Sequence, residues 1–420
     1  MTDQNNEFTT DELEAPSWLN TQFLEQVLSK HEGDEQLAVK TIKVSPATLK
    51  GDHYASIMFR VVVEYTNKQG NASKSLIVKT MPQVEGFKKE QLGESHIFRT
   101  EIGMYTEVLP KFEAVLREAG DNTSLCVPCI YHSLEPQQVM IFDDLVPLGY
   151  IVVRDREPTM DEVRLAFSKL AKWHAVSFKM LKEQPQVFQK FKYSLMELPK
   201  ITEDPFMYGI DFFIRMLDEV PDLKAYKPSL EKIRENLVEN FRAPFVEHRE
   251  NRQDDAYYVL CHEDLYIRNM MFKHDKITNV AEDCMLIDFQ MSNVGSMPND
   301  IIYATYQMLS PDQRQNHLEE LIRFYFSIFT DTLKKINYKG ESPLLEKFQQ
   351  QYFRQKHLEI FLLTTFLPLR YYIKSGKQKF DDVTQWREND ELRQNFYRIE
   401  GYVEETRNLL KRFAQRGYFD

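Results

Sequence analysis

The stretch Cys261-His-Glu-Asp-Leu-Tyr-Ile-Arg-Asn269 decides the fold that we predict for this chain of 420 residues. It has the form His-x-Asp-x-x-x-x-Asn, and its fixed positions are His262, Asp264 and Asn269. Phosphoryl transfer needs a base that accepts the proton of the attacking hydroxyl, and oxygen ligands for the metal ions that neutralise the phosphates. Asp264 suits the first role and Asn269 suits the second. Taken alone, each residue is also an ordinary turn former.

A predicted β-hairpin follows this stretch and ends at a second acidic residue. Two short apolar runs, 270–272 and 285–287, predict strands, and the polar segment 273–283 joins them. Asp288 comes directly after the second strand, in Asp-Phe-Gln. Because a hairpin returns its end to its start, we expect Asp288 to lie beside Asn269 as a second metal ligand. Together, the motif, the hairpin and Asp288 favour a site for phosphoryl transfer over the alternative that each of these residues only forms a turn.

The periodicity of the sequence predicts an α+β fold of two lobes. Residues 39–81 alternate in the manner of a three-stranded antiparallel meander, 96–118 have a helical stripe, and β character returns at 139–142. From residue 160 onward the pattern is mostly helical, apart from the hairpin. We therefore expect a small antiparallel sheet with one helix, followed by a large helical lobe. The predicted division is 1–35 for a polar leader and first helix, 36–145 for a nucleotide-binding lobe, and 146–420 for a helical lobe with the catalytic loop and substrate site.

The amino-terminal lobe contains a lysine that needs a counter-charge. Lys79 lies in the apolar strand 75–81, and Glu101 is the acidic residue on the apolar stripe of the following helix. We predict a Lys79–Glu101 ion pair that holds the lysine against nucleotide phosphates. Asp52 and Asp144 are competing partners, and either charge of the pair could instead reach solvent at the edge of the sheet.

Two further segments are candidates for nucleotide contacts. The turn Lys50-Gly-Asp-His-Tyr-Ala-Ser56 could cover phosphates with its backbone N–H groups, so Gly51 and Ser56 are candidate cofactor-binding residues. A plain hairpin turn would have the same composition. Asp144 lies in Asp143-Asp-Leu145 after a predicted strand, where backbone groups could bind an adenine ring.

Composition and charge exclude several classes of protein. The formal net charge of −11 argues against nucleic-acid binding. The longest apolar run, 360–369, is interrupted and too short to span a membrane. The acidic, polar beginning has no signal-peptide pattern, and four cysteines are too few for a disulfide scaffold. We therefore expect a cytoplasmic protein, without a membrane segment and without an obligate protein partner.

The motifs of other enzyme classes are missing from the sequence. It contains no Walker phosphate loop, no Gly-x-Ser-x-Gly elbow, no Gly-x-Gly-x-x-Gly fingerprint and no His-Glu-x-x-His zinc helix. Cys126-x-x-Cys129 with His132 could bind zinc, but a fourth ligand is not evident, and a pair of buried thiols explains the same pattern.

The sequence resembles the ecdysteroid-kinase-like, choline-kinase-like family of insects, within the protein-kinase/aminoglycoside-phosphotransferase superfamily. The resemblance covers nearly the whole chain. The matching stretches, in order, are Gly51–Ser56, Leu76–Lys79, Glu101–Tyr105, Val108–Pro110, Asp143–Leu145, Leu170–Ala175, Val259–Asn269 and Leu286–Gln290, with Asp300.

The resemblance implies a two-lobed protein-kinase-like fold and a transfer of phosphate from ATP, with magnesium, to a hydroxyl of a small molecule. The substrate would be an ecdysteroid, a related steroid or a xenobiotic alcohol. Aromatic residues of the helical half would suit a ring-bearing substrate, although core packing explains them equally well; they are Phe206, Tyr208, Phe212, Phe213, Tyr371, Tyr372 and Trp386. By resemblance, Asp264 is the catalytic base, Asn269 and Asp288 bind magnesium, Lys79 and Glu101 form the lysine pair, and Asp300 braces the catalytic loop.

Two positions depart from the family pattern, because the family usually has glycine at the position of Glu263 and tryptophan at that of Tyr266. A second acid beside Asp264 could repel nucleotide phosphate or simply point to solvent. Glu263 is the feature that favours an alternative function, a kinase-fold receptor that binds a small molecule or nucleotide with little catalysis. The three residues of the proposed catalytic machinery are present, and we therefore favour an enzyme.

Overall fold

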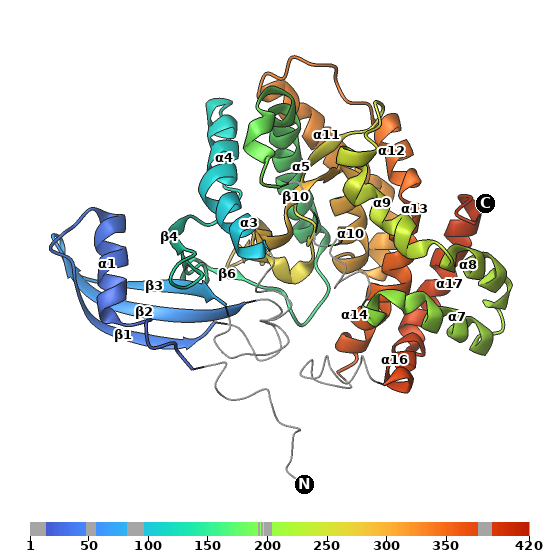
Figure 1. Cartoon of the computed structure of the whole chain (residues 1–420), viewed down its shortest axis with the longest axis horizontal. Coiled ribbons are helices and arrows are strands. Elements are labelled where there is room, and N and C mark those ends of the chain that lie inside the picture. The colour runs from blue at the N-terminus through green and yellow to red at the C-terminus, as the bar shows by residue number, and fades with distance from the viewer. Residues whose placement is uncertain are drawn as a thin grey trace, which may run out of the picture. The chain divides into compact units, whose positions relative to one another are not determined.

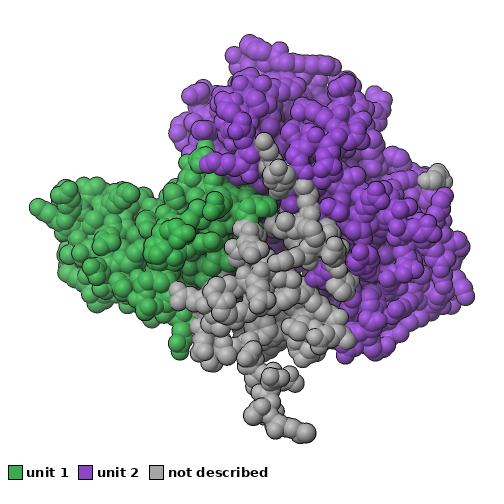
Figure 2. All heavy atoms as spheres, in the orientation of Figure 1, with its two compact units in different colours: residues 1–107, 126–151 green, residues 108–125, 152–420 purple. Residues whose placement is uncertain are grey.

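The computed structural model describes residues 14–47, 56–81, 96–191, 194, 196, 204–376 and 389–419. The chain divides into two units, which Figure 2 distinguishes by colour. Unit 1 comprises Met1–Glu107 and Cys126–Ile151, and unit 2 comprises Val108–Leu125 and Val152–Asp420. The division predicted from the sequence, at residue 145, remains a proposal. It assigns nucleotide binding to the first lobe, and the catalytic loop and substrate site to the second.

Unit 1 is built on a five-stranded antiparallel sheet with the strand order β1-β2-β3-β5-β4 (Figure 1). Its strands are β1 (Ala38–Pro46), β2 (Ile57–Asn67), β3 (Gly70–Thr80), β4 (Cys129–Ser133) and β5 (Val139–Asp143). The predicted meander forms β1, β2 and β3, and the later β segment returns as β5 beside β3. Unit 1 also contains the two-residue strand β6 (Tyr150–Ile151) and the short helix η3 (Val146–Leu148).

Strict alternation of side chains on β2 creates the core of unit 1. Phe59, Val61 and Val63 are buried on one face of the strand. Helix α1 (Thr21–Glu32) packs Leu24 and Leu28 into the same hydrophobic cluster. Helix α3 (Ile97–Gly103) continues into the π-helix η2 (Met104–Val108), which ends in the boundary between the two units.

Unit 2 is mainly helical, as the sequence predicted, with two short pairs of strands. The helices are α4 (Leu109–Glu118), α5 (Met160–Glu183), η4 (Pro185–Phe188), η6 (Pro205–Tyr208), α7 (Gly209–Glu219), η7 (Lys224–Tyr226), α8 (Lys227–Arg234), α9 (Leu237–Glu250), η8 (Ile267–Asn269), η9 (Phe289–Met291), α10 (Pro298–Gln307), η10 (Gln313–His317), α11 (Leu318–Lys335), α12 (Leu345–Arg354), α13 (Lys356–Phe361), η11 (Leu362–Phe366), α14 (Leu367–Lys374), α16 (Asp390–Tyr397) and α17 (Glu400–Gln415). The strands pair as β7 (Tyr258–Cys261) with β10 (Asn293–Ser296), and β8 (Met270–His274) with β9 (Ala281–Leu286). The antiparallel sheet and this helical unit confirm the predicted α+β fold.

Helix α5 is the central support of unit 2. It begins with a capping box, in which Thr159 and Glu162 each accept a backbone N–H group from the other. Glu162 is fully buried and also accepts hydrogen bonds from Arg156 and His274. The helix packs against α11, β7 and β9. Its buried face therefore reaches the strands that precede and follow the predicted catalytic residues.

In the part of the chain that the structure describes, no helix has both the length and the apolar character that a membrane crossing needs.

Candidate functional site

The carboxylate of Asp264, in the loop after β7, is held through both of its oxygens. The amide nitrogen of Asn269 donates to Asp264 Oδ2 at 2.7 Å and to the backbone carbonyl of Asp264 at 3.0 Å. The hydroxyl of Tyr303, on α10, donates to Asp264 Oδ1 at 2.9 Å. The sequence predicted that Asp264 and Asn269 act together, but it gave no role to Tyr303. The feature of the sequence that could have pointed to Tyr303 is its position three residues after Asp300.

A second carboxylate, that of Asp300, holds the backbone of the same loop. Its oxygens accept the N–H groups of His262 and Glu263, both at 2.8 Å, and Nε2 of His174 lies 3.0 Å away. Burial raises the pKa of Asp300, but hydrogen bonds from His174 and the loop outweigh burial and hold the pKa below its usual value. Asp300 is therefore an ionised acceptor, and it has the bracing position that the family resemblance implied.

His262 is a structural histidine in this loop. Its Nε2 lies 3.1 Å from the carbonyl oxygen of Ile287, so it donates there, and Nδ1 accepts the N–H group of Asp264 at 3.3 Å. The ring packs against Trp173 and Phe289. Burial lowers the pKa of His262, although the charge of Asp300 opposes this effect. A neutral imidazole with one donor and one acceptor therefore joins the loop to the residue before Asp288.

The hairpin of β8 and β9 brings Asn269 and Asp288 to the same end, as predicted. Met270 pairs with Leu286, and the N–H group of Ile287 donates to the carbonyl of Asn269 at 3.1 Å. Asp288 follows with a left-handed backbone, φ 65°, and Gln290 donates to its carboxylate at 3.3 Å. That conformation is uncommon for a residue other than glycine, and it is found at functional sites.

The donor atoms at this end of the hairpin suit magnesium. Asn269 directs its amide nitrogen to Asp264, which leaves its Oδ1 to serve as a ligand atom, and its backbone carbonyl accepts the N–H group of Ile287, the residue before Asp288. Magnesium prefers oxygen ligands and is commonly held by one or two carboxylates together with substrate phosphates. Within the described ranges, no group of three or more His, Cys, Asp and Glu side chains could hold a metal ion. A magnesium ion here would therefore need oxygen ligands from its nucleotide and from water.

In unit 1, Lys79 and Glu101 form the predicted ion pair. Lys79 Nζ lies 2.6 Å from Glu101 Oε2, and both side chains are buried, with 5% and 2% of their area exposed. Lys79 is on β3 and Glu101 is on α3. The pair holds the two buried side chains against each other and fixes the direction of the lysine.

The carboxylate of Asp144 is held by groups other than Lys79. It accepts hydrogen bonds from Arg60 at 2.6 Å, from Ser75 at 2.8 Å and from the N–H group of Val146 at 3.1 Å. Burial raises the pKa of Asp144, but these donors outweigh burial and lower it. The side chain therefore braces the segment after β5, and only the backbone of this segment remains a candidate for binding an adenine ring.

The structure covers the other candidate residues only in part. Ser56 is buried directly before β2. Gly51 and Asp52 lie outside the described residues, as does Trp386. Of the aromatic residues proposed to line a substrate site, Phe212 stacks on Tyr397, Tyr372 packs against Phe396, and Tyr208 is exposed. Core packing accounts for the first two.

The four cysteines are free thiols. Cys126 is buried, and burial raises the pKa of the Cys129 thiol to about 12. Cys129 is half-buried, so the expected pair of buried thiols holds for Cys126 alone.

The sequence allowed Glu263 to point to solvent. In the structure, its side chain instead lies in a buried polar cluster. The cluster consists of Ser194, Glu263, Asn293 and Asn299, all of which are less than one-twentieth exposed. Ser194 donates to Glu263 Oε2 at 2.8 Å, and Oε1 lies near the amide of Asn299, against Gly295. Burial raises the pKa of Glu263 to about 8. Its φ of 61° explains why glycine suits this position in the family that the sequence resembles.

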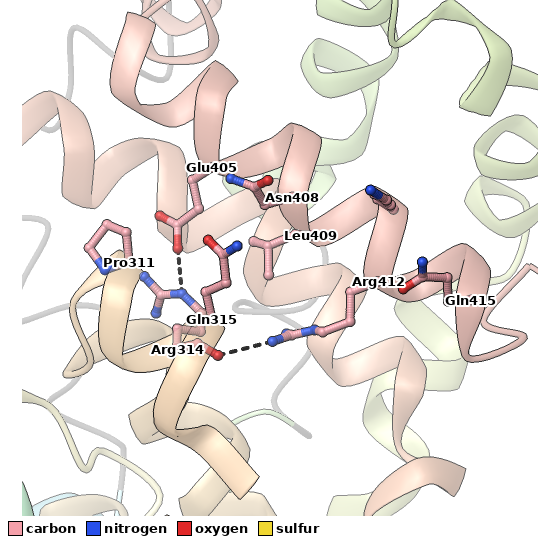
Figure 3. A pocket seen from close by; sticks show the side chains of 9 residues that line it. Pro311, Arg314, Gln315, Glu405, Asn408, Leu409, Arg412 and Gln415 are labelled. Carbon is pink, nitrogen blue, oxygen red and sulfur yellow. Dashed lines mark hydrogen bonds and ion pairs between the residues drawn. The ribbon is translucent and has the colours of Figure 1, made fainter.

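A separate pocket of about 310 Å³ lies in unit 2, lined by residues of 311–315 and of α17 (Figure 3). Arg314 Nε donates to Glu405 at 2.6 Å, and Arg412 donates to the carbonyl oxygen of Arg314 at 3.1 Å. None of the residues that the sequence singled out for chemistry lines this pocket. We therefore assign it no part in phosphoryl transfer.

The chain is similar to a known family over most of its length. The model of the ecdysteroid kinase-like family matches residues 50–338. No curated protein matches the chain. Among solved structures, a choline kinase from Cryptosporidium parvum Iowa II is 13% identical, with a TM-score of 0.45 and coverage of 94% of this chain and 97% of that chain. An ethanolamine kinase from Plasmodium vivax is 11% identical, with a TM-score of 0.41 and coverage of 96% and 97%. Amicoumacin kinase, in a complex that contains AMP-PNP and Ca²⁺, is 12% identical, with a TM-score of 0.40 and coverage of 89% and 93%.

The raised pKa of Glu263 predicts a loss of stability with rising pH. The folded chain holds a proton on this carboxyl up to about pH 8, whereas a glutamate in the unfolded chain, with its usual pKa of 4.5, releases it much earlier. The free energy of unfolding should therefore fall between these two pH values. Glu263→Gln stays neutral and should remove most of that fall.

Urea unfolding of both proteins at several pH values measures this difference. Glu341→Gln, at a side chain that is 83% exposed, is the matched control and should behave as the unaltered chain. Equal losses of stability in the unaltered chain and in Glu263→Gln would contradict the assignment.

Proposed function

The chain belongs to the ecdysteroid kinase-like family, and we propose on that basis that it transfers the γ-phosphate of ATP, with magnesium, to a hydroxyl of a small molecule. The observation that carries the proposal is the geometry of Asp264, whose two carboxylate oxygens are held by Asn269 and Tyr303. A carboxylate fixed in this way can accept a proton from one defined direction.

In the proposed reaction, the acceptor hydroxyl loses its proton to Asp264 while its oxygen forms a bond to the γ-phosphorus. The bond between that phosphorus and the bridging oxygen breaks, and ADP leaves with the bonding electrons. Magnesium, when bound, neutralises the charge on the phosphate oxygens. Asn269 and Asp288 would hold it with their side-chain oxygens, and the hairpin keeps these two residues adjacent.

Lys79 would bind phosphate oxygens of the nucleotide. Its ion pair with Glu101 keeps the ammonium group in one position at a buried site. A lysine in this role orients the phosphates and adds positive charge that the transition state needs. Gly51, Ser56 and the backbone beside Asp144 remain proposed nucleotide contacts.

The acceptor would be an ecdysteroid, as the family name suggests, or a related steroid or xenobiotic alcohol, as the resemblance of the sequence implies. A ring-bearing acceptor agrees with the two aromatic side chains of Tyr303 and Phe366, of which Tyr303 donates to Asp264. Phe366, in the π-helix η11, contacts the ring of Tyr303 edge-on at 6.3 Å between centroids. π-helical turns are frequent at functional sites. We further propose that the reaction takes place in the cytoplasm and needs no protein partner.

Asp264→Asn should abolish turnover and leave ATP binding nearly unchanged. An amide cannot accept the proton, and loss of a general base lowers kcat by about 100-fold or more. Asp331→Asn, at an exposed carboxylate on α11, is the control and should keep full activity. Steady-state kinetics together with calorimetric ATP binding measures both effects. Full turnover in Asp264→Asn would contradict the role of the base.

Asp288→Asn should reduce the gain in ATP affinity that magnesium provides, because an amide offers the ion one neutral oxygen in place of a charged carboxylate. Calorimetric titrations with ATP, in the presence and absence of magnesium, measure that gain. We expect at least about a tenfold loss of the gain, which corresponds to about 1.4 kcal/mol. If magnesium raises the ATP affinity of Asp288→Asn as much as that of the unaltered chain, Asp288 is not a magnesium ligand.

A further inference from the structure

Tyr303 contacts the proposed catalytic base, and nothing in the sequence motif assigns it a role. We propose that Tyr303 is a positioning residue for Asp264: its hydroxyl and the amide of Asn269 together fix the rotation of the Asp264 carboxylate. The inference rests on the proposed phosphotransfer function, in which Asp264 must face the acceptor hydroxyl. It adds a residue that acts through the base and does not itself accept the proton.

Two donors from different elements restrain the carboxylate. Asn269 approaches Oδ2 at 2.7 Å from the loop, and Tyr303 approaches Oδ1 at 2.9 Å from α10. The torsion that rotates an aspartate carboxylate is soft, so a single donor would leave its orientation poorly defined. Donors on both oxygens therefore define the orientation of the carboxylate.

Helix α10 carries both Tyr303 and Asp300. The two residues are three positions apart and therefore lie on one face of the helix. Asp300 holds the backbone N–H groups of the catalytic loop, and Tyr303 holds the side chain of its base. The ring of Tyr303 is itself supported by Phe366. A single rigid element thus positions both the loop and the carboxylate.

The surroundings keep Tyr303 a donor. Burial and the charge of Asp264 raise the pKa of Tyr303 well above its usual value, so its hydroxyl stays protonated. The other titratable groups around this loop are His262, Glu263, Tyr266, Asp288 and Asp300, and Tyr303→Phe leaves all of them in place.

Tyr303→Phe tests the inference, because it removes one hydroxyl and keeps the ring. We expect kcat to fall by about tenfold or more, the range for a lost hydrogen bond to a charged group, with the KM for ATP nearly unchanged. Tyr306→Phe is the matched control, since Tyr306 lies on the same helix and its hydroxyl donates to Glu359 at 3.1 Å. A kcat equal to that of the unaltered chain would overturn the inference.

A second readout does not depend on turnover. Carboxyl NMR at one pH, on chains labelled with ¹³C at aspartate Cγ and with Asp264→Asn used to identify the Asp264 signal, reports the hydrogen bonds of this carboxylate directly. Tyr303→Phe should move the Asp264 signal, and Tyr306→Phe should not. If the unaltered chain transfers no phosphate, the proposed function fails, and the signal still decides the contact. An Asp264 signal at the same position in the unaltered chain and in Tyr303→Phe would refute the positioning role.

Discussion

The buried carboxylate of Asp300 is the constraint on which the candidate catalytic loop depends. It accepts two consecutive backbone N–H groups, those of His262 and Glu263, and lies 3.0 Å from Nε2 of His174 on α5. Two consecutive donors to one carboxylate fix the loop in a conformation that includes a left-handed backbone at Glu263, which a residue with a side chain adopts only when its surroundings enforce it. With the loop held in this way, Asp264 has a defined position, and the donors of Asn269 and Tyr303 then set its direction.

The sequence predicted those parts of the molecule that local patterns determine. The alternation of apolar residues on β2 predicted the sheet, and the hairpin of β8 and β9 followed from two short apolar runs around a polar turn. The Lys79–Glu101 pair was also predictable, because a lysine in an apolar strand needs a counter-charge and Glu101 was the acid on the apolar side of the next helix. Each of these predictions depends on residues that are close in sequence or on a charge with few possible partners.

Contacts between distant segments could not be read from the sequence in the same way. Tyr303 lies 39 positions from Asp264 and has no distinguishing pattern around it. The sequence identified Glu263 as a departure from the family pattern, because it is an acid next to the proposed base. Only the folded chain shows that Ser194 donates to its carboxylate in a buried cluster. The carboxylate of Asp144 was a candidate partner for Lys79, and Arg60 holds it instead. These side chains have several possible partners, and tertiary packing decides between them.

Transfer of phosphate is the central claim, and direct detection of the product tests it most clearly. The chain would be incubated with ATP labelled at the γ-phosphate, magnesium and a panel of ecdysteroids, choline-like alcohols and plant glycoside aglycones, and the products separated by mass. The account predicts that one class of alcohol gains the labelled phosphate as ADP forms in equal amount. Binding of ATP and magnesium with no labelled product from any alcohol of the panel would contradict it and would favour a receptor that keeps the fold of a kinase.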